Sequence, residues 1–148
     1  MLALLQRVTE AKVSVADECI AHIHTGLLAF IGVERGDAER QAERMLERLA
    51  GYRIFSDADG RMNLSLEQIQ GGLLLVPQFT LPADTRKGNR PGFSPAAPPE
   101  VGQAIFEHLL GCAITRFPSV QSGRFGANMQ VALVNDGPVT FMLQVPVA

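Results

Sequence analysis

The C-terminal stretch 129–145 constrains the fold of this chain most strongly. Residues 129–134 and 139–145 largely alternate apolar with polar side chains, and Asn135-Asp136-Gly137-Pro138 lies between the two runs. A period of two is typical of half-buried strands, and Asn, Asp and Gly between two such runs favour a tight turn. The pattern therefore predicts an antiparallel hairpin. Pro138 is unexpected there, because it removes a backbone donor where the second strand would begin to pair.

Patterns upstream predict further strands. The chain begins with two short strands at 2–9 and 11–17, or with one bent strand across both. The run 27–33 is apolar throughout, which indicates a strand covered on both faces. Other strands are predicted at 18–24, 52–55, 73–76 and 120–122.

Two amphipathic helices accompany these strands. Asp37 is predicted to cap a helix that runs to about residue 52, with apolar residues at helical spacing. A loop rich in Pro and Gly covers 82–99, and a second helix is predicted to start at Pro98-Pro99. The predicted fold class is α/β: a compact single domain over residues 1–148, with mostly antiparallel sheets in layers and two main helices.

Composition excludes several classes of protein. The 148 residues are 47% hydrophobic, which excludes a disordered chain, and no apolar run reaches the roughly 18 residues of a membrane span. Residues 1–7 lack the features of a signal peptide, so a first strand is expected there. Cys19 and Cys112 are too few for a disulfide framework or a zinc site and favour a reducing cytoplasm. Because the net charge is −2, nucleic-acid binding would need a local basic patch.

Side chains typical of catalytic or metal sites are sparse. His22 and His24 share one face of a predicted strand and could bind a metal, but surface histidines are the simpler interpretation. His108 is expected on the solvated side of the second helix, and both cysteines are expected to be inert. The stretch 57–60 resembles the start of a calcium loop but lacks the later acidic ligands, so a plain turn is predicted. No nucleophile beside a base and an orienting acid can be recognised.

Two segments remain as candidate functional sites. Gln78 and Thr80 follow a buried strand, and backbone N–H groups in 78–80 could bind an oxyanion. The alternative is a strand end that simply runs into a loop. Arg86, Lys87 and Arg90 form the one local concentration of basic charge and could contact phosphates. Here the alternative is a solvated loop.

Five motifs, in order along the chain, resemble the D-aminoacyl-tRNA deacylase family. They are Leu4-Leu5-Gln6-Arg7-Val8-Thr9, Arg53-Ile54-Phe55-Ser56-Asp57, Gln78-Phe79-Thr80-Leu81, Ala83-Asp84-Thr85-Arg86-Lys87-Gly88 and Asn135-Asp136-Gly137-Pro138-Val139-Thr140. The resemblance implies a cytoplasmic homodimer that hydrolyses the ester between a D-amino acid and the 3′-terminal adenosine of tRNA. It also implies removal of glycine mischarged onto tRNA for alanine. No metal or other cofactor is implied, and no membrane or DNA partner.

The resemblance also implies roles for individual residues. Those that it places at the site are Arg7, Gln78, Phe79, Thr80, Phe125, Met129, Gly137 and Pro138. The segment 78–80 would line the catalytic site, with Phe125 and Met129 near the adenine. The Gly137-Pro138 dipeptide would have a cis peptide bond, be held by Arg7, and reach into the partner's pocket to exclude L-amino acids. From their charge, and not from the resemblance, the basic residues 86, 87 and 90 are expected to contact the tRNA.

Two positions depart from the family pattern. Pro77 replaces a usual Ser before the 78–80 segment, and Asn128 stands where an acidic residue is common. An aminoacyl ester is already activated, so we expect positioning and oxyanion stabilisation, with help from the substrate's 2′-OH, and no covalent step at Thr80. The alternatives are a catalytically inactive protein that binds the tRNA 3′ end, as Pro77 would suggest, and a small-molecule-binding oligomeric scaffold.

Overall fold

Eight strands and three helices make up residues 1–147, the part of the chain that this computed structural model describes. The strands are β1 (Leu2–Val15), β2 (Glu18–Ile23), β3 (Gly26–Gly32), β4 (Arg53–Ser56), β5 (Met62–Ser65), β6 (Gly72–Pro77), β7 (Val120–Ser122) and β8 (Gln130–Gln144). The helices are α1 (Glu39–Gly51), α2 (Leu66–Ile69) and α3 (Pro99–Arg116). The predicted α/β class, with two main helices, is confirmed.

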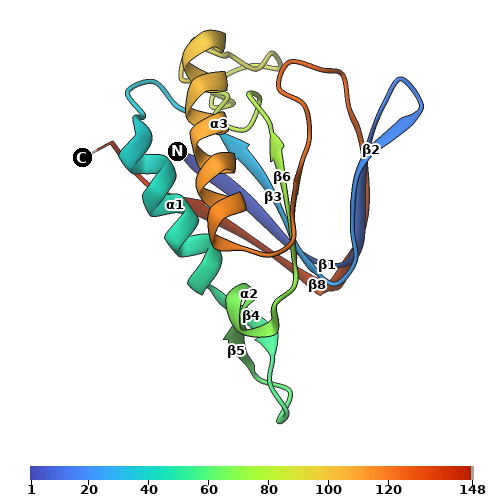
Figure 1. Cartoon of the computed structure of the whole chain (residues 1–148). Helices are drawn as coiled ribbons and strands as arrows, with labels where there is room; N and C mark the ends of the chain where they lie inside the picture. Colours follow the sequence, from blue (N-terminus) through green and yellow to red (C-terminus); the bar gives the residue numbers. More distant parts are fainter. Residues whose placement is uncertain (148) are drawn as a thin grey trace.

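The long bent strand β1 organises the main sheet (Figure 1). β8 pairs with one edge of β1, antiparallel, along nearly its whole length. On the other edge, β3 pairs with residues 2–8 of β1 and β2 pairs with residues 11–15. β6 and β7 then extend the sheet in parallel from β3. Of the two predictions for the start of the chain, one bent strand is the correct one.

The predicted C-terminal hairpin is wrong, because its two arms do not pair with each other. Both arms belong to β8 and pair with β1. Asn135 lies opposite Val8 and Thr140 lies opposite Gln6, so four residues of β8 face a single residue of β1. These four residues, three more than the strand pairing needs, form a bulge, which we call the 136–139 bulge.

Side chains at its two ends close this bulge. Asn135 Nδ2 donates to Thr140 Oγ1 at 2.7 Å, and Asn135 Oδ1 accepts from the Val139 N–H at 2.9 Å. Ladder pairing with β1 resumes at Thr140. The missing N–H of Pro138 therefore costs the ladder nothing, because Pro138 lies inside the bulge and not at the start of a paired strand.

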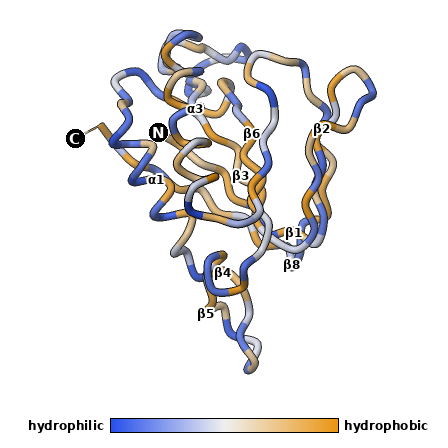
Figure 2. Tube along the Cα trace, viewed as in Figure 1, coloured by the Kyte–Doolittle hydropathy of each residue, from blue (hydrophilic) through white to orange (hydrophobic). Residues whose placement is uncertain are grey.

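β3 and β6 are covered on both faces, as the apolar run 27–33 predicts. Leu27, Ala29 and Ile31 pack into the larger hydrophobic core with α1 and α3. Leu28 packs on the other face, in a second core that residues of β1, β2 and β6 also form. Figure 2 shows the largely hydrophobic trace of β3 and β6 in the middle of the molecule.

α1 and α3 lie side by side over one face of the sheet (Figure 1). The prediction that Asp37 caps α1 is wrong, since the N-cap position is Ala38. Asp37 is buried and accepts instead from the Glu34 N–H at 2.7 Å and from the Met1 amine at 2.9 Å. Within residues 1–147 none of the helices has the length and apolar character needed to cross a membrane.

β4 and β5 pair as a separate two-stranded sheet, and Ile54, Phe55 and Leu66 of β4 and α2 join the larger core. The turn predicted at 57–60 is confirmed, because the Asp57 carboxylate accepts from the N–H groups of Asp59 and Arg61 in its own loop. β5 and α2 were not predicted. A capping box does mark the start of α2, with Ser65 and Gln68 bonded reciprocally.

Candidate active site

A cavity of about 760 Å³ lies at the C-terminal ends of β3 and β6. Its walls come from the residues after β6, the first half of α3 and the segment 125–131. In open sheets, such strand ends are where ligands commonly bind, and the volume is in the range of small-molecule sites. We call it the main cavity. Gln78, Phe79, Thr80, Phe125 and Met129, five of the residues predicted for the site, line it.

A tight turn presents residues 78–81 to the main cavity. The Gln78 N–H donates to Ile31 O at 2.8 Å and so adds one last bond to the β3–β6 pair. The chain then turns, and the Leu81 N–H donates to Gln78 O at 3.2 Å. The N–H groups of Phe79 and Thr80 donate to no acceptor within residues 1–147. Two neighbouring backbone donors are thereby left available for an oxygen of a ligand.

The Thr80 hydroxyl has no base beside it. It accepts a hydrogen bond from Gln78 Nε2 at 2.9 Å. Of the described residues that line the main cavity, Arg35 alone is charged, and none is His, Asp or Glu. A hydroxyl without a proton acceptor is a poor nucleophile, which argues against a covalent step at Thr80.

Phe125 and Met129 form the wall opposite the turn. The Phe125 ring packs near Phe106 of α3, with ring centroids 6.5 Å apart. Met129 Sδ lies over Gly123, where a Cβ would come within 2.7 Å of it, and accepts from the Arg124 N–H at 3.4 Å. Gly123 thus makes room for the methionine, and the wall offers a planar apolar surface on which a purine can stack.

Sequence reasoning missed the other aromatic residues of the main cavity. Phe30, Phe93 and Phe106 also line it, and Phe93 lies against Phe79 with ring centroids 5.3 Å apart. Both members of this pair are exposed. Phe93 could have been recognised, because an aromatic residue in a loop rich in Pro and Gly is a candidate for ligand binding. Phe30 looked like any other core residue of an apolar strand.

Pro77 costs the sheet no hydrogen bond to β3. Along β6, residues 72 and 78 direct their N–H groups to β3, whereas Leu73 donates to Ser119 on the β7 side. Successive residues of a strand direct their N–H groups to opposite edges, and Pro77 is four residues after Leu73. The missing N–H of Pro77 would therefore point away from β3, as that of Leu73 does. There the pairing of β6 with β7 has already ended, at Leu75 and Ser122. Proline is tolerated at such an edge position.

The structure places the other predicted residues, Arg7, Gly137 and Pro138, outside the main cavity. Gly137-Pro138 is a cis peptide, as expected, and both residues are exposed at the tip of the 136–139 bulge. Arg7 reaches back to the bulge, with Nε 3.2 Å from Asp136 O and 3.3 Å from Asp136 Oδ2. Its NH1 donates to Ile54 O at 2.9 Å, which anchors the bulge to β4.

The bulge is too far away to reach the main cavity of its own chain. Arg7 pairs with Leu27 at the start of β3, whereas Gln78 binds Ile31 near its end. These levels differ by about 13 Å along the strand, and three strand spacings between β8 and β6 add about 14 Å across the sheet. None of residues 136–139 lines the main cavity.

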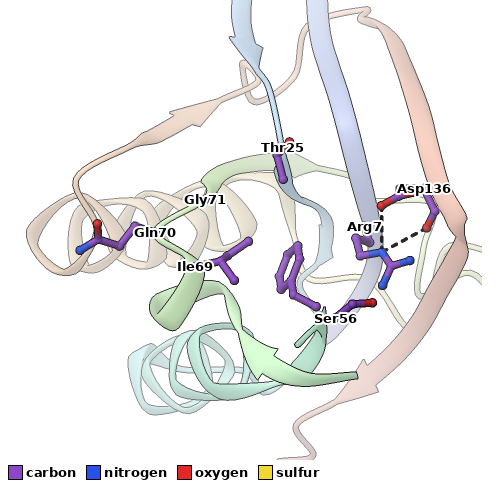
Figure 3. A pocket seen from close by; sticks show the side chains of 8 residues that line it. Arg7, Thr25, Ser56, Ile69, Gln70, Gly71 and Asp136 are labelled. Atoms are coloured by element: carbon purple, nitrogen blue, oxygen red, sulfur yellow. Dashed lines mark hydrogen bonds and ion pairs between the residues drawn. The ribbon is translucent and has the colours of Figure 1, made fainter. Parts of the chain in front are cut away.

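A second cavity, of about 400 Å³, lies beside the bulge (Figure 3). Arg7 and Asp136 line one side of it, and Ile69 and Gln70 of the α2 region line the other. Figure 3 shows Arg7 turned toward Asp136, with dashed lines marking the contacts between the two residues. This cavity is therefore lined by residues that hold the bulge in place.

The basic loop connects two segments that line the main cavity, the first ending at Thr80 and the second beginning at Phe93. A bridge between Asp84 and Gly92 closes it, with reciprocal backbone bonds of 2.7 and 2.9 Å. Arg86 forms two side-chain hydrogen bonds to Asp84, both 2.8 Å, which hold the pKa of that carboxyl well below its usual range. Much of the Arg86 charge is therefore compensated locally. Lys87 and Arg90 are exposed.

Comparison with known proteins gives a consistent result. The family model for D-Tyr-tRNA(Tyr) deacylase matches residues 4–144. A D-aminoacyl-tRNA deacylase of Nitrosococcus oceani is 60% identical over 148 residues, which cover 100% of this chain and 96% of the relative.

Two solved structures resemble the chain. The c-Myc DNA unwinding element binding protein is 36% identical, with a TM-score of 0.94 and 99% of each chain covered. A probable eukaryotic D-amino acid tRNA deacylase is 19% identical, with a TM-score of 0.81 and 97% and 98% covered. The second similarity supports the fold alone.

Proposed function

This chain belongs to the D-aminoacyl-tRNA deacylase family and is an enzyme of that activity, and we propose that its main cavity positions the ester of the tRNA for attack by water. In this arrangement the N–H groups of Phe79 and Thr80 bind the carbonyl oxygen as it becomes an oxyanion. The 3′ adenine stacks against Phe125 and Met129. The products are the free amino acid and tRNA. We expect the enzyme to act in the cytoplasm, where tRNA is charged.

One observation carries this mechanism: the main cavity combines two free backbone donors with a lining that holds neither a carboxylate nor an imidazole among the residues described. Such a site has no side chain that can act as general acid or base, so it could not hydrolyse a stable amide. An aminoacyl ester needs less, because its leaving group is good and its own ribose 2′-OH can assist the water. Removing one oxyanion donor typically costs about 10²–10³ in rate, so two donors supply much of what this reaction requires.

We also propose that the chain works as a homodimer in which each 136–139 bulge completes the partner's main cavity. The support is that the bulge is exposed, is fixed by Arg7 and Asn135, and is about 20 Å from its own cavity on the strand spacings given above. A tip made of main chain and a proline ring cannot move aside for a side chain. It would therefore exclude the L configuration sterically.

Glycine fits the same arrangement. Since glycine has no side chain, steric exclusion at the α-carbon cannot reject it. We therefore expect glycine mischarged onto tRNA for alanine to be a second substrate. We expect no DNA substrate, because a duplex does not present an activated ester at a free 3′ end.

The direct test compares D-Tyr-tRNA with L-Tyr-tRNA as substrates of the purified enzyme. We expect rapid release of D-tyrosine and an L-substrate half-life equal to that without enzyme. Equal hydrolysis of the two esters, or hydrolysis of neither, would contradict the proposal.

The inactive tRNA-binding alternative has its own test, in Pro77→Ser. Because the N–H restored at this position would point away from β3, we expect the substitution to leave activity within about threefold, less than the loss of one hydrogen bond. A wild-type protein that binds tRNA without turnover, together with a Pro77→Ser variant that hydrolyses the ester, would favour the alternative.

A further inference from the structure

A cluster of metal-ligating side chains joins α1 to α3, away from the main cavity. Glu43 on α1, and His108 and Cys112 on α3, each offer one ligand atom, and these atoms all lie within 4.8 Å of one another. His108 Nε2 lies 2.9 Å from Glu43 Oε1 and 3.7 Å from Cys112 Sγ. None of the three residues lines either cavity.

Helix geometry produces this convergence. His108 and Cys112 are four residues apart on α3, so their side chains lie on one face, one turn from each other. Glu39 and Glu43 have the same spacing on α1, and the two helices pack side by side. Sequence alone could not bring the pairs together, because 65 residues separate Glu43 from His108.

The second ring nitrogen of His108 faces a carboxylate. Its Nδ1 lies 3.7 Å from Glu39 Oε1, and Glu39 is an exposed side chain that can close to hydrogen-bond distance by a small rotation. A ligating histidine almost always donates its other N–H to a carboxylate, a backbone carbonyl or water, which fixes the tautomer and makes the ligand more basic. Glu39 thus serves as support for the site, leaving Nε2 to face Glu43 and Cys112.

We propose that Glu43, His108 and Cys112 bind a zinc ion that clamps α1 to α3. Thiolate, imidazole and carboxylate are the three ligand types that Zn²⁺ takes in proteins. Tetrahedral zinc, with Zn–N of about 2.0 Å and Zn–S of about 2.3 Å, holds neighbouring ligand atoms about 3.5 Å apart. The 3.7 Å between Nε2 and Sγ is close to this value, and the 2.9 Å hydrogen bond between Nε2 and Glu43 Oε1 would widen as zinc replaces its proton. Three protein ligands leave the fourth position to water. Since none of its ligands lines the main cavity, the zinc site is separate from the proposed deacylation site.

A second cluster is less well built. Ligand atoms of Glu10, His22 and His24 also lie within 4.8 Å of one another. Glu10 lies on β1, His22 on β2 and His24 just after β2, and Glu10, the only carboxylate in the group, would itself have to be a ligand. This second cluster has no thiolate, so a signal from thiolate–metal bonding can come only from the Glu43–His108–Cys112 cluster.

The test uses the full chain, reduced, stripped with EDTA and titrated with Co²⁺ as a spectroscopic substitute for zinc. We expect a near-ultraviolet thiolate-to-cobalt charge-transfer band that Zn²⁺ abolishes by displacement. Cys112→Ser and His108→Asn should lose the band, while Cys19→Ser keeps it. Glu39→Gln should weaken cobalt binding about 10–100-fold without loss of the band at saturation.

A second measurement needs no variant. Zinc should slow alkylation of Cys112 by iodoacetamide at least about tenfold, as a metal-bound thiolate is withdrawn from reaction, with no effect on the exposed Cys19. Excess EDTA should restore the rate. Absence of the cobalt band in the wild type, its persistence in Cys112→Ser, or equal alkylation of Cys112 with and without zinc would each overturn the proposal.

Discussion

Thr80 and Gly137 show how the proposed site depends on main-chain geometry. Thr80 places its N–H at the main cavity, while its hydroxyl is occupied by Gln78. Gly137 has φ +121°, in the region that L side chains rarely adopt, and a Cβ there would lie 3.0 Å from Arg7 NH2. Substitutions at these two residues therefore distinguish side-chain chemistry from backbone position.

Thr80→Ala should lower kcat/KM only about three- to tenfold, the effect of losing one hydrogen bond of about 1 kcal/mol. Single-turnover hydrolysis of D-Tyr-tRNA measures this, with the exposed Thr115→Ala of α3 as the control that should match wild type. A fall of about 10⁴-fold, which removal of a covalent nucleophile gives, would contradict the positioning mechanism.

Gly137→Ala should lower deacylation at least about tenfold, because the Cβ displaces Arg7 or Val139 and moves the tip of the bulge by a fraction of an ångström. Gly60→Ala is the control: Gly60 has φ +78° but open space around its Cβ position. Both variants should lose about 1 kcal/mol of stability from the backbone. Equal activity of the two would show that the bulge has no part in the reaction.

Lys87→Ala and Arg90→Ala should weaken tRNA binding and flatten its salt dependence. For every phosphate that the protein no longer neutralises, the slope of log K against log salt should become shallower by about 0.7–0.9. Arg86→Ala should change the slope less, since Asp84 already pairs with Arg86. The exposed Arg40 of α1 is the control for a charge removed elsewhere. Unchanged slopes for the Lys87 and Arg90 variants would mean that the loop is simply solvated.

At the scale of elements, sequence patterns predicted strands and helices better than they predicted partners. β7 has the predicted bounds, and α3 starts where Pro98-Pro99 indicated. The 129–145 hairpin failed because alternation shows which face of a strand is buried and not which strand lies beside it. Asp37 failed as a cap because a buried amine competes for its carboxylate.

The same limit applied to the site. The 78–80 turn was recognised because polar residues end an apolar strand, and the residues that line the cavity with it came from the family resemblance. The Glu43–His108–Cys112 cluster could not be predicted, because only the packing of α1 against α3 brings its members together.

Gly26 controls how closely β3 approaches β6. A Cβ at Gly26 would lie 2.0 Å from Gly72 O, a main-chain atom that cannot yield without separating the strands. Gly26→Ala should therefore lower the free energy of unfolding by about 3 kcal/mol, measured by urea denaturation. Gly51→Ala, where nothing lies within 4 Å, should be neutral or slightly stabilising. Similar midpoints for both variants would contradict this packing.

For the whole molecule, the two halves of the proposed site lie at separate places on one chain. The main cavity lies at the C-terminal ends of β3 and β6, and the 136–139 bulge lies level with the start of β3. A closed two-fold dimer lets each chain supply both halves, one to itself and one to its partner. Alignment of motifs along a sequence cannot show this, since it says nothing about which copy contributes each residue.

Mixed dimers test this central claim most directly. Thr80→Trp should block the main cavity and Gly137→Ala should disable the bulge, so each homodimer should have little activity on D-Tyr-tRNA. Refolding the two together should give half mixed dimers, each with one intact cavity facing one intact bulge, and so restore about a quarter of wild-type activity. Activity no higher than that of the separate variants would contradict a site shared between two chains.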